Sequence, residues 1–141
     1  MTTSPTFDTV QVGDLLPALQ LPPVDRTALA LFAGASGDHN PIHIDTDFAR
    51  RSGMPDVFAQ GMLGMAWVGR VLTGWAPQSR LRRFDVRFQG ITHLGNARRC
   101  SGRVVEKLDD HNGERCVRIE VLSANQFGQT KIAGEAIVAL P

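Results

Sequence analysis

Asp38 and His43 are the two residues of this chain whose types and spacing best suit catalysis. They stand five positions apart in a polar stretch, with Asn40 and Pro41 between them. An acid and an imidazole on one rigid loop can transfer protons, because the carboxylate can orient or charge the imidazole, or both groups can hold one water molecule. The spacing alone is weak evidence for catalysis, because it also fits a structural role in which Asp38 only accepts hydrogen bonds from nearby backbone N–H groups.

A metal site at the same stretch is the weaker interpretation. His39 and His43 are four positions apart, which would place them on one face of a helix. Pro41 interrupts any helix between them, because it has no N–H group and restricts the backbone of Asn40. No third ligand is evident, whereas protein zinc sites use at least three protein ligands. We therefore predict no metal and no other cofactor.

Two predicted helices flank this polar stretch and should hold it in place. Asp25 can cap a helix over 27–33, which Gly37 can end in the left-handed conformation. Asp45 can cap a short second helix that ends before Gly53. The candidate residues are therefore expected on a short loop between two helices.

The segment from Gly61 to Trp75 is apolar on nearly every side and is interrupted only by Arg70. A helix at the surface of a protein normally shows a polar stripe. We therefore predict a long helix that is enclosed by other structure. This segment is too short to span a bilayer, and a charged residue interrupts it.

After Pro77 the apolar residues alternate with a period of two, which predicts strands. Four strands are expected, over 83–89, 100–108, 117–121 and 130–140. Asn112-Gly113 is a strong signal for a tight hairpin between two of them. We predict an antiparallel meander of these four strands, with a further short extended segment within 10–21. An antiparallel sheet wrapped around one long buried helix is an α+β arrangement, the hot-dog fold.

The length of 141 residues fits a single domain, and we expect a flexible tail over 1–9 and one domain over 10–141. The charges nearly balance, at 15 Lys and Arg against 14 Asp and Glu, which argues against nucleic-acid and membrane partners. The polar start is not a signal peptide. Cys100 and Cys116 are expected to be half-buried free thiols in a cytoplasmic protein.

Seven of the 15 cations lie within 24 residues: Arg80, Arg82, Arg83, Arg87, Arg98, Arg99 and Arg103. They fit either a solvated sheet face or a patch that binds the phosphates of a nucleotide-bearing cofactor or of a carrier protein's phosphopantetheine. Strand alternation places Arg83 and Arg87 on the same side, so this pair is the first candidate for binding the phosphates of coenzyme A (CoA).

The stretch Ala35-Ser36-Gly37-Asp38-His39-Asn40-Pro41-Ile42-His43-Ile44-Asp45 resembles the hydratase motif of the MaoC-like family. This family includes the (R)-specific enoyl-CoA hydratases and the related 3-hydroxyacyl dehydratases. The similarity continues through 59–63 and 134–138, and it covers nearly the whole chain. It implies a single hot-dog domain that dimerises, with the acyl chain in a tunnel near the dimer interface.

The resemblance also implies roles for individual residues. Asp38 and His43 would be the catalytic pair. Gly61 would offer its backbone N–H to the thioester carbonyl, and a helix N-terminus suits this role because its N–H groups are free and its dipole favours negative charge. Asn40 would either fix the loop or be a plain turn residue. Three residues would either line the acyl tunnel or belong to the core, namely Phe58, Met62 and Met65.

Two positions depart from the family pattern. Gln60 stands where the family often has histidine; glutamine cannot titrate, but its amide can still form hydrogen bonds in a supporting role. Gly69 stands in the part of the long helix where some members carry a serine that supports the aspartate. Support for Asp38 must therefore come from elsewhere.

The implied activity is that of a hydro-lyase in fatty-acid, polyketide or related acyl metabolism. It would add water to a trans-2-enoyl thioester to give an (R)-3-hydroxyacyl thioester, or remove it, with acyl-CoA or acyl-carrier protein as the substrate handle and a homodimer as the assembly. Two alternatives remain. A hot-dog acyl-CoA thioesterase would not need His43 on the same loop, and a non-catalytic acyl-binding subunit of a heterodimeric dehydratase would tend to lose the pair.

Overall fold

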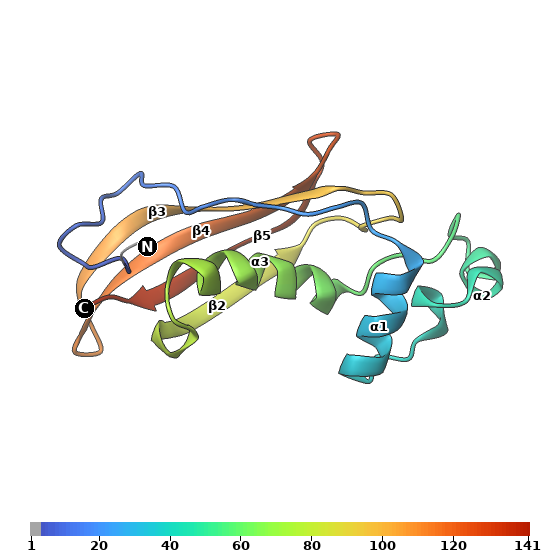
Figure 1. Ribbon diagram of the computed structural model, residues 1–141, viewed down its shortest axis with the longest axis horizontal. Coiled ribbons are helices and arrows are strands. Elements are labelled where there is room, and N and C mark those ends of the chain that lie inside the picture. Colours follow the sequence, from blue (N-terminus) through green and yellow to red (C-terminus); the bar gives the residue numbers. More distant parts are fainter. Residues whose placement is uncertain (1–3) are drawn as a thin grey trace.

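The computed structural model describes residues 4–141 and shows an antiparallel sheet with one long helix lying along it (Figure 1). This confirms the predicted α+β hot-dog architecture. The elements are β1 (Leu19–Gln20), α1 (Arg26–Ser36), η1 (Pro41–His43), α2 (Thr46–Arg51), α3 (Gly61–Trp75), η2 (Gln78–Arg80), β2 (Leu81–Phe88), β3 (Arg98–His111), β4 (Glu114–Asn125) and β5 (Thr130–Ala139).

The strand order across the sheet is β1-β3-β4-β5-β2, so the predicted four-strand meander is wrong in one place. β3, β4 and β5 form a meander, but β2 pairs with β5 instead of β3. The stretch 89–97 is too long for a tight hairpin and carries the chain from one edge of the sheet toward the other. Gly134 allows the close approach of β2, because a Cβ atom there would overlap the backbone of Asp85.

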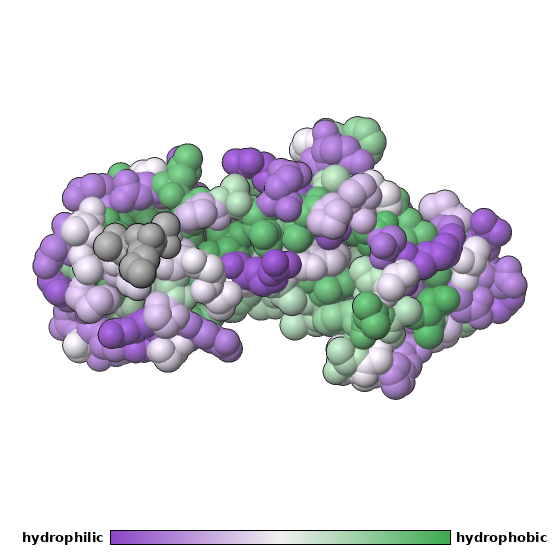
Figure 2. Space-filling view, in the orientation of Figure 1, coloured by the Kyte–Doolittle hydropathy of each residue, from purple (hydrophilic) through white to green (hydrophobic). Residues whose placement is uncertain are grey.

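Helix α3 packs one face against the sheet through Val68, Val71 and Leu72, each of them almost fully buried. The other face is not enclosed by this chain, and the side chain of Met62 is 58% exposed. The expectation of a helix covered on all sides is therefore wrong for the single chain, because five strands cover only one side of it. Figure 2 shows apolar residues at the surface around α1 and the start of α3.

The segment before β1 is packed against the sheet instead of forming a loose tail. Phe7 is buried, and its N–H donates to the carbonyl of Pro141 at 2.9 Å. The ammonium of Lys107 donates to the carbonyls of Phe7 and Val10 at 2.6 and 2.9 Å. These contacts do not fit the expected flexible tail at residues 6–9, and residues 1–3 lie outside the described residues.

Helices α1 and α2 form a lobe that extends beyond the end of the sheet (Figure 1). The carboxylate of Asp25 caps α1 by accepting from the N–H of Ala28 at 2.8 Å, and Gly37 ends it with a φ of 76°. Asp45 caps α2 through the N–H groups of Asp47 and Phe48. These caps agree with the sequence, and each contributes about 1 kcal/mol to helix stability. The lobe has its own small core, formed by Val24, Leu29, Ala49, Val57 and Ala59.

The remaining local predictions concern the hairpin and the two thiols. Asn112 and Gly113 both have positive φ, at 54° and 82°, which is the geometry of a type I′ turn and confirms the hairpin. Cys100 and Cys116 are both free and fully buried instead of half-buried. Burial raises the pKa of both thiols. No helix within residues 4–141 is long and apolar enough to cross a membrane.

Candidate active site

The loop between α1 and α2 brings Asp38 and His43 face to face. Oδ2 of Asp38 lies 3.8 Å from Nε2 of His43. Asn40 shapes the loop, because its Oδ1 accepts the N–H of Ile42 at 3.1 Å and so caps the short helix η1. Pro41 is the first residue of η1, where its missing N–H costs nothing. The geometry of the loop is therefore set by its own sequence.

A backbone carbonyl fixes the orientation of the His43 imidazole. The Nδ1 atom lies 2.7 Å from the carbonyl oxygen of Phe58, and the two aromatic rings meet edge to face at 5.1 Å. A carbonyl can only accept, so Nδ1 carries the proton in this bond. In the neutral imidazole, Nε2 then presents its lone pair toward Asp38. The imidazole is largely buried, whereas the side chain of Asp38 is 42% exposed.

Asp38 is supported by its own loop. Its Oδ1 accepts the N–H of Asn40 at 3.3 Å, and its own N–H donates to Oγ of Ser36 at 3.1 Å. Gly69, where the resemblance implied a supporting serine, lies against the ring of Phe84 instead. Residues 4–141 contain no group of three or more His, Cys, Asp or Glu side chains that could hold a metal ion.

A cavity of about 380 Å³ opens at the N-terminus of α3. Its lining includes Phe58, Gly61, Gly64, Phe88, Ile91 and Ile132. The two glycines keep it open: a Cβ atom on Gly61 would lie 3.3 Å from the Phe88 ring, and one on Gly64 would lie 2.8 Å from Ile132. No side chain caps α3, so the N–H groups of its first turn are free to bind an oxygen atom.

Of the three predicted tunnel residues, Phe58 lines this cavity and Met62 and Met65 do not. Gly61 and Gly64 lie three positions apart and share one face of α3. The two methionines have the same spacing but lie one position further along, about 100° around the helix axis. The sequence did not show which face of the apolar helix would meet the cavity.

Gln60 is fully buried directly before Gly61, and it also lines the cavity. Its Nε2 donates to the carbonyl of Leu29 in α1 at 3.0 Å, which ties the start of α3 to the lobe. Its Oε1 has no hydrogen-bond partner among residues 4–141. If the amide were flipped, its Oε1 would face the carbonyl oxygen of Leu29, and two acceptors would repel each other. The amide therefore keeps its orientation, and Oε1 is a free acceptor beside the N-terminus of α3.

The structure does not bring Arg83 and Arg87 to the loop that carries Asp38 and His43. Both line a separate hollow of about 840 Å³ on the other face of the sheet, where Arg83 pairs with Asp85. The rest of the arginine cluster is dispersed. Arg82 pairs with Glu114, and Arg98 is buried, so that burial lowers its pKa to about 10.

Two features of the site were not found from the sequence. One is the Phe58 carbonyl, which holds His43, whereas only the Phe58 side chain was considered, for the tunnel or the core. The other is the carboxylate of Asp56, which binds Arg26 and Thr46 beside the loop. An aspartate directly after a proline is typical of a turn, in which its side chain accepts hydrogen bonds from nearby backbone N–H groups. This local pattern does not predict which side chains of other elements will bind the carboxylate.

The chain is thus a hot-dog domain that carries an acid and an imidazole, Asp38 and His43, on the loop between α1 and α2. The sequence profile described as "MaoC like domain" matches residues 11–126. The chain therefore belongs to the MaoC-like family.

Solved structures support this assignment. A MaoC-like dehydratase superposes with a TM-score of 0.87 at 28% identity, over 98% of this chain and 43% of that chain. The unliganded R-hydratase PhaJ1 from Pseudomonas aeruginosa gives a TM-score of 0.80 at 27% identity, over 96% of this chain and 85% of that chain.

Among curated proteins, the fatty acid synthase subunit beta of Saccharomyces cerevisiae is 27% identical over 113 residues. These residues cover 78% of this chain and 5% of that protein. The chain thus corresponds to a small part of its curated relatives.

Proposed function

We propose that the protein adds water to trans-2-enoyl thioesters to form (R)-3-hydroxyacyl thioesters, and catalyses the reverse dehydration. The observation that carries this proposal is the pair of atoms Nε2 of His43 and Oδ2 of Asp38, 3.8 Å apart. That separation is too long for a direct hydrogen bond and suits a water molecule that both groups hold. The family membership supports the same reaction class.

In the proposed hydration, the Asp38 carboxylate orients the water and Nε2 of His43 takes one of its protons. The oxygen of the water bonds to the β-carbon, and the electrons of the double bond move to the thioester oxygen as an enolate. The N–H of Gly61 donates to that oxygen, in the position where negative charge develops. The α-carbon then takes the proton from His43, so that one water supplies both groups to the same face.

The cavity at the start of α3 is the proposed site of the acyl group. Its volume of about 380 Å³ lies within the range of small-molecule pockets. Phe88, Ile91 and Ile132 supply apolar walls, and the free N–H of Gly61 supplies the polar contact at its edge. The carrier of the thioester, either CoA or an acyl-carrier protein, would extend outward from this edge.

We propose a homodimer as the active assembly. β2 lies at one edge of the sheet, where its outer backbone groups are available for pairing with another strand. Phe88 at the end of β2 is 53% exposed, and Met62 on α3 is 58% exposed. A second copy that met this edge would cover both side chains.

The test is a panel of trans-2-enoyl-CoA substrates of increasing length. Hydration of each substrate is measured as the loss of its enoyl absorbance. Product chirality is measured by coupling to an (S)-specific 3-hydroxyacyl-CoA dehydrogenase with NAD. Enoyl loss without NADH supports the proposal, and strong NADH formation would show the (S) product and contradict it.

The alternatives give different results in the same assay. A thioesterase would release free CoA, which a thiol reagent detects. Cys100 and Cys116 are fully buried and add little background to that measurement while the protein stays folded. An accessory subunit would be inactive alone, and light scattering would then show whether the chain forms the proposed homodimer.

A further inference from the structure

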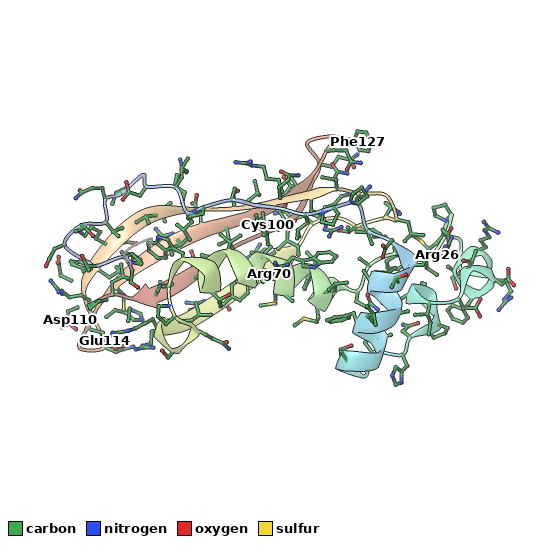
Figure 3. All side chains as sticks on the ribbon, in the orientation of Figure 1. Arg26, Arg70, Cys100, Asp110, Glu114 and Phe127 are labelled. Carbon is green, nitrogen blue, oxygen red and sulfur yellow. The ribbon has the colours of Figure 1, made fainter. Side chains whose placement is uncertain are left out.

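The carboxylate of Asp56 joins three separate parts of the active-site lobe. Arg26, at the start of α1, donates to both of its oxygens at 3.0 and 2.5 Å. The hydroxyl of Thr46, at the start of α2, donates to Oδ1 at 2.9 Å, and the N–H of Val57 donates to the same oxygen at 2.7 Å. Arg26 also donates to the Thr46 hydroxyl at 2.8 Å, which closes the network. Figure 3 shows Arg26 in this lobe, beyond the end of the sheet.

This network holds the backbone on both sides of the hydrogen bond that orients His43. Thr46 lies three residues after His43, and the N–H of Val57 lies one residue before the Phe58 carbonyl. The two ends of the His43–Phe58 bond are thus anchored to one carboxylate. Movement of either anchor would change the 2.7 Å distance between Nδ1 and the carbonyl oxygen.

We propose that Asp56, through Arg26 and Thr46, is a positioning residue for the catalytic imidazole. It holds the Phe58 carbonyl against Nδ1 of His43, and thereby keeps Nε2 directed at Asp38. The catalytic part of this inference rests on the proposed hydratase function. The orientation of the ring can be measured without any activity.

The chain contains a matched control for a charge pair of the same geometry. Arg82 donates to both oxygens of Glu114 at 2.5 and 2.7 Å, but this pair joins β2 to β4. Glu114 and Arg26 lie at opposite ends of the molecule in Figure 3. Loss of the Glu114 pair therefore removes a two-pronged ion pair without touching the lobe that holds His43.

The experiment compares Thr46→Val, Thr46→Ser, Asp56→Asn and Glu114→Gln with the wild-type chain. The tautomer of His43 is read from the nitrogen NMR shifts of its ring, assigned by their absence in His43→Gln. The wild-type ring should carry its proton on Nδ1 in one well-defined state. Thr46→Val and Asp56→Asn should give mixed tautomers and lower kcat by roughly ten- to a hundred-fold, the scale for a small misplacement of a catalytic group. KM should change much less.

Thr46→Ser keeps the hydroxyl, so it should keep the wild-type tautomer of His43 and the wild-type kcat. Glu114→Gln should change neither the tautomer nor kcat. The inference is overturned if folded Thr46→Val and Asp56→Asn keep the wild-type ring signals. It is overturned equally if Glu114→Gln alters those signals as much as they do. If Asp56→Asn does not fold, Thr46→Val decides. An inactive wild-type chain would refute the proposed function, and the ring signals would still decide this inference.

Discussion

The guanidinium of Arg98 lies 3.5 Å from the centre of the Trp67 ring and so joins β3 to α3. Arg98 is only 3% exposed, and no ion pair links it to an acid within residues 4–141. Its Nη1 donates to the carbonyl of Asn96 at 2.9 Å. The planar group therefore depends on stacking for much of its stabilisation, because it has left water without a counter-charge.

Arg98→Lys should lower the melting temperature although it keeps the charge, because an ammonium lacks the planar face with which the guanidinium stacks on the indole ring. The loss should be roughly 0.5–1 kcal/mol, because the ammonium keeps part of the cation–π attraction. Thermal unfolding measures it. Arg99→Lys is the control, since the neighbouring Arg99 is exposed on the other face of β3. Equal melting temperatures for the two variants would contradict the stacking argument.

Asp38→Asn and His43→Gln should each lower kcat by at least roughly a hundred-fold, the usual scale for loss of a general acid–base group. Substrate binding should change much less, because neither side chain lines the cavity at the start of α3. The double variant should be little worse than either single variant, since the pair acts as a unit. Steady-state hydration of a short enoyl-CoA gives these values. Near-normal kcat in either single variant would show that the mechanism is wrong.

Gly134→Ala should destabilise the protein strongly, because the new methyl group would overlap the backbone of Asp85 in β2. Overpacking of this kind costs about 1–3 kcal/mol, or more where the neighbour is backbone. Gly74→Ala is the control, since nothing lies within 4 Å of the added Cβ atom in α3. It should stabilise the protein by roughly 0.5–1 kcal/mol through helix propensity. Denaturant unfolding that ranked the two variants in the opposite order would overturn the strand order at this edge.

How far the sequence could predict this structure depends on the range of each contact. The caps Asp25, Gly37 and Asp45 were predictable because each acts on its own helix within a few residues. The position of β2 was not, because an alternating strand fits either edge of the sheet equally well. Gly134 in β5 indicates the close approach of a neighbouring strand, but the sequence does not show that this strand is β2.

The same distinction applies to the active site. Asp38 and His43 share one loop, so their type and spacing made them candidates, and the resemblance of that loop to the MaoC-like motif selected them as a pair. The Phe58 carbonyl is a backbone group, so its contact with His43 cannot be predicted from the type of the residue. The partners of Asp56 lie on two helices whose relative orientation the sequence does not predict. The burial of Arg98 depends on Trp67 in another element, so its place in the arginine cluster suggested an exposed residue instead.

Acid should remove the contribution of Asp56 to stability. Its pKa lies well below its ordinary value of 3.8, mainly because the Arg26 side chain donates to it. Between the lowered pKa and the ordinary pKa of Asp56, the folded state therefore binds fewer protons than the unfolded chain. The stabilisation is complete above the ordinary pKa, and it is lost as the pH falls toward the lowered pKa. The difference in melting temperature between wild type and Asp56→Asn should thus be greatest near neutral pH and shrink below about pH 4. A difference that grew on acidification would contradict this sign.

Arg87→Gln tests whether the outer face of β2 binds the phosphates of CoA. If it does, KM for an enoyl-CoA should rise several-fold with kcat nearly unchanged, because the contact is remote from the reacting atoms. Added salt should reduce the effect by screening. Arg83→Gln should have a smaller effect, because Arg83 is already paired with Asp85. A KM that stayed the same at low salt for both variants would assign these arginines to a solvated face.

The strand order also has a consequence for how the chain matures as it leaves the ribosome. The loop with Asp38 and His43 is synthesised early, and its caps and the Asp56 network involve only residues of the first half of the chain. β2 must wait for β5, the last strand, before it has a neighbour in the sheet. Ile132 belongs to that strand and forms a wall of the cavity. A nascent chain or a proteolytic fragment that stops before residue 130 would therefore carry Asp38 and His43 but no complete cavity, and it would leave β2 exposed to pairing with other chains.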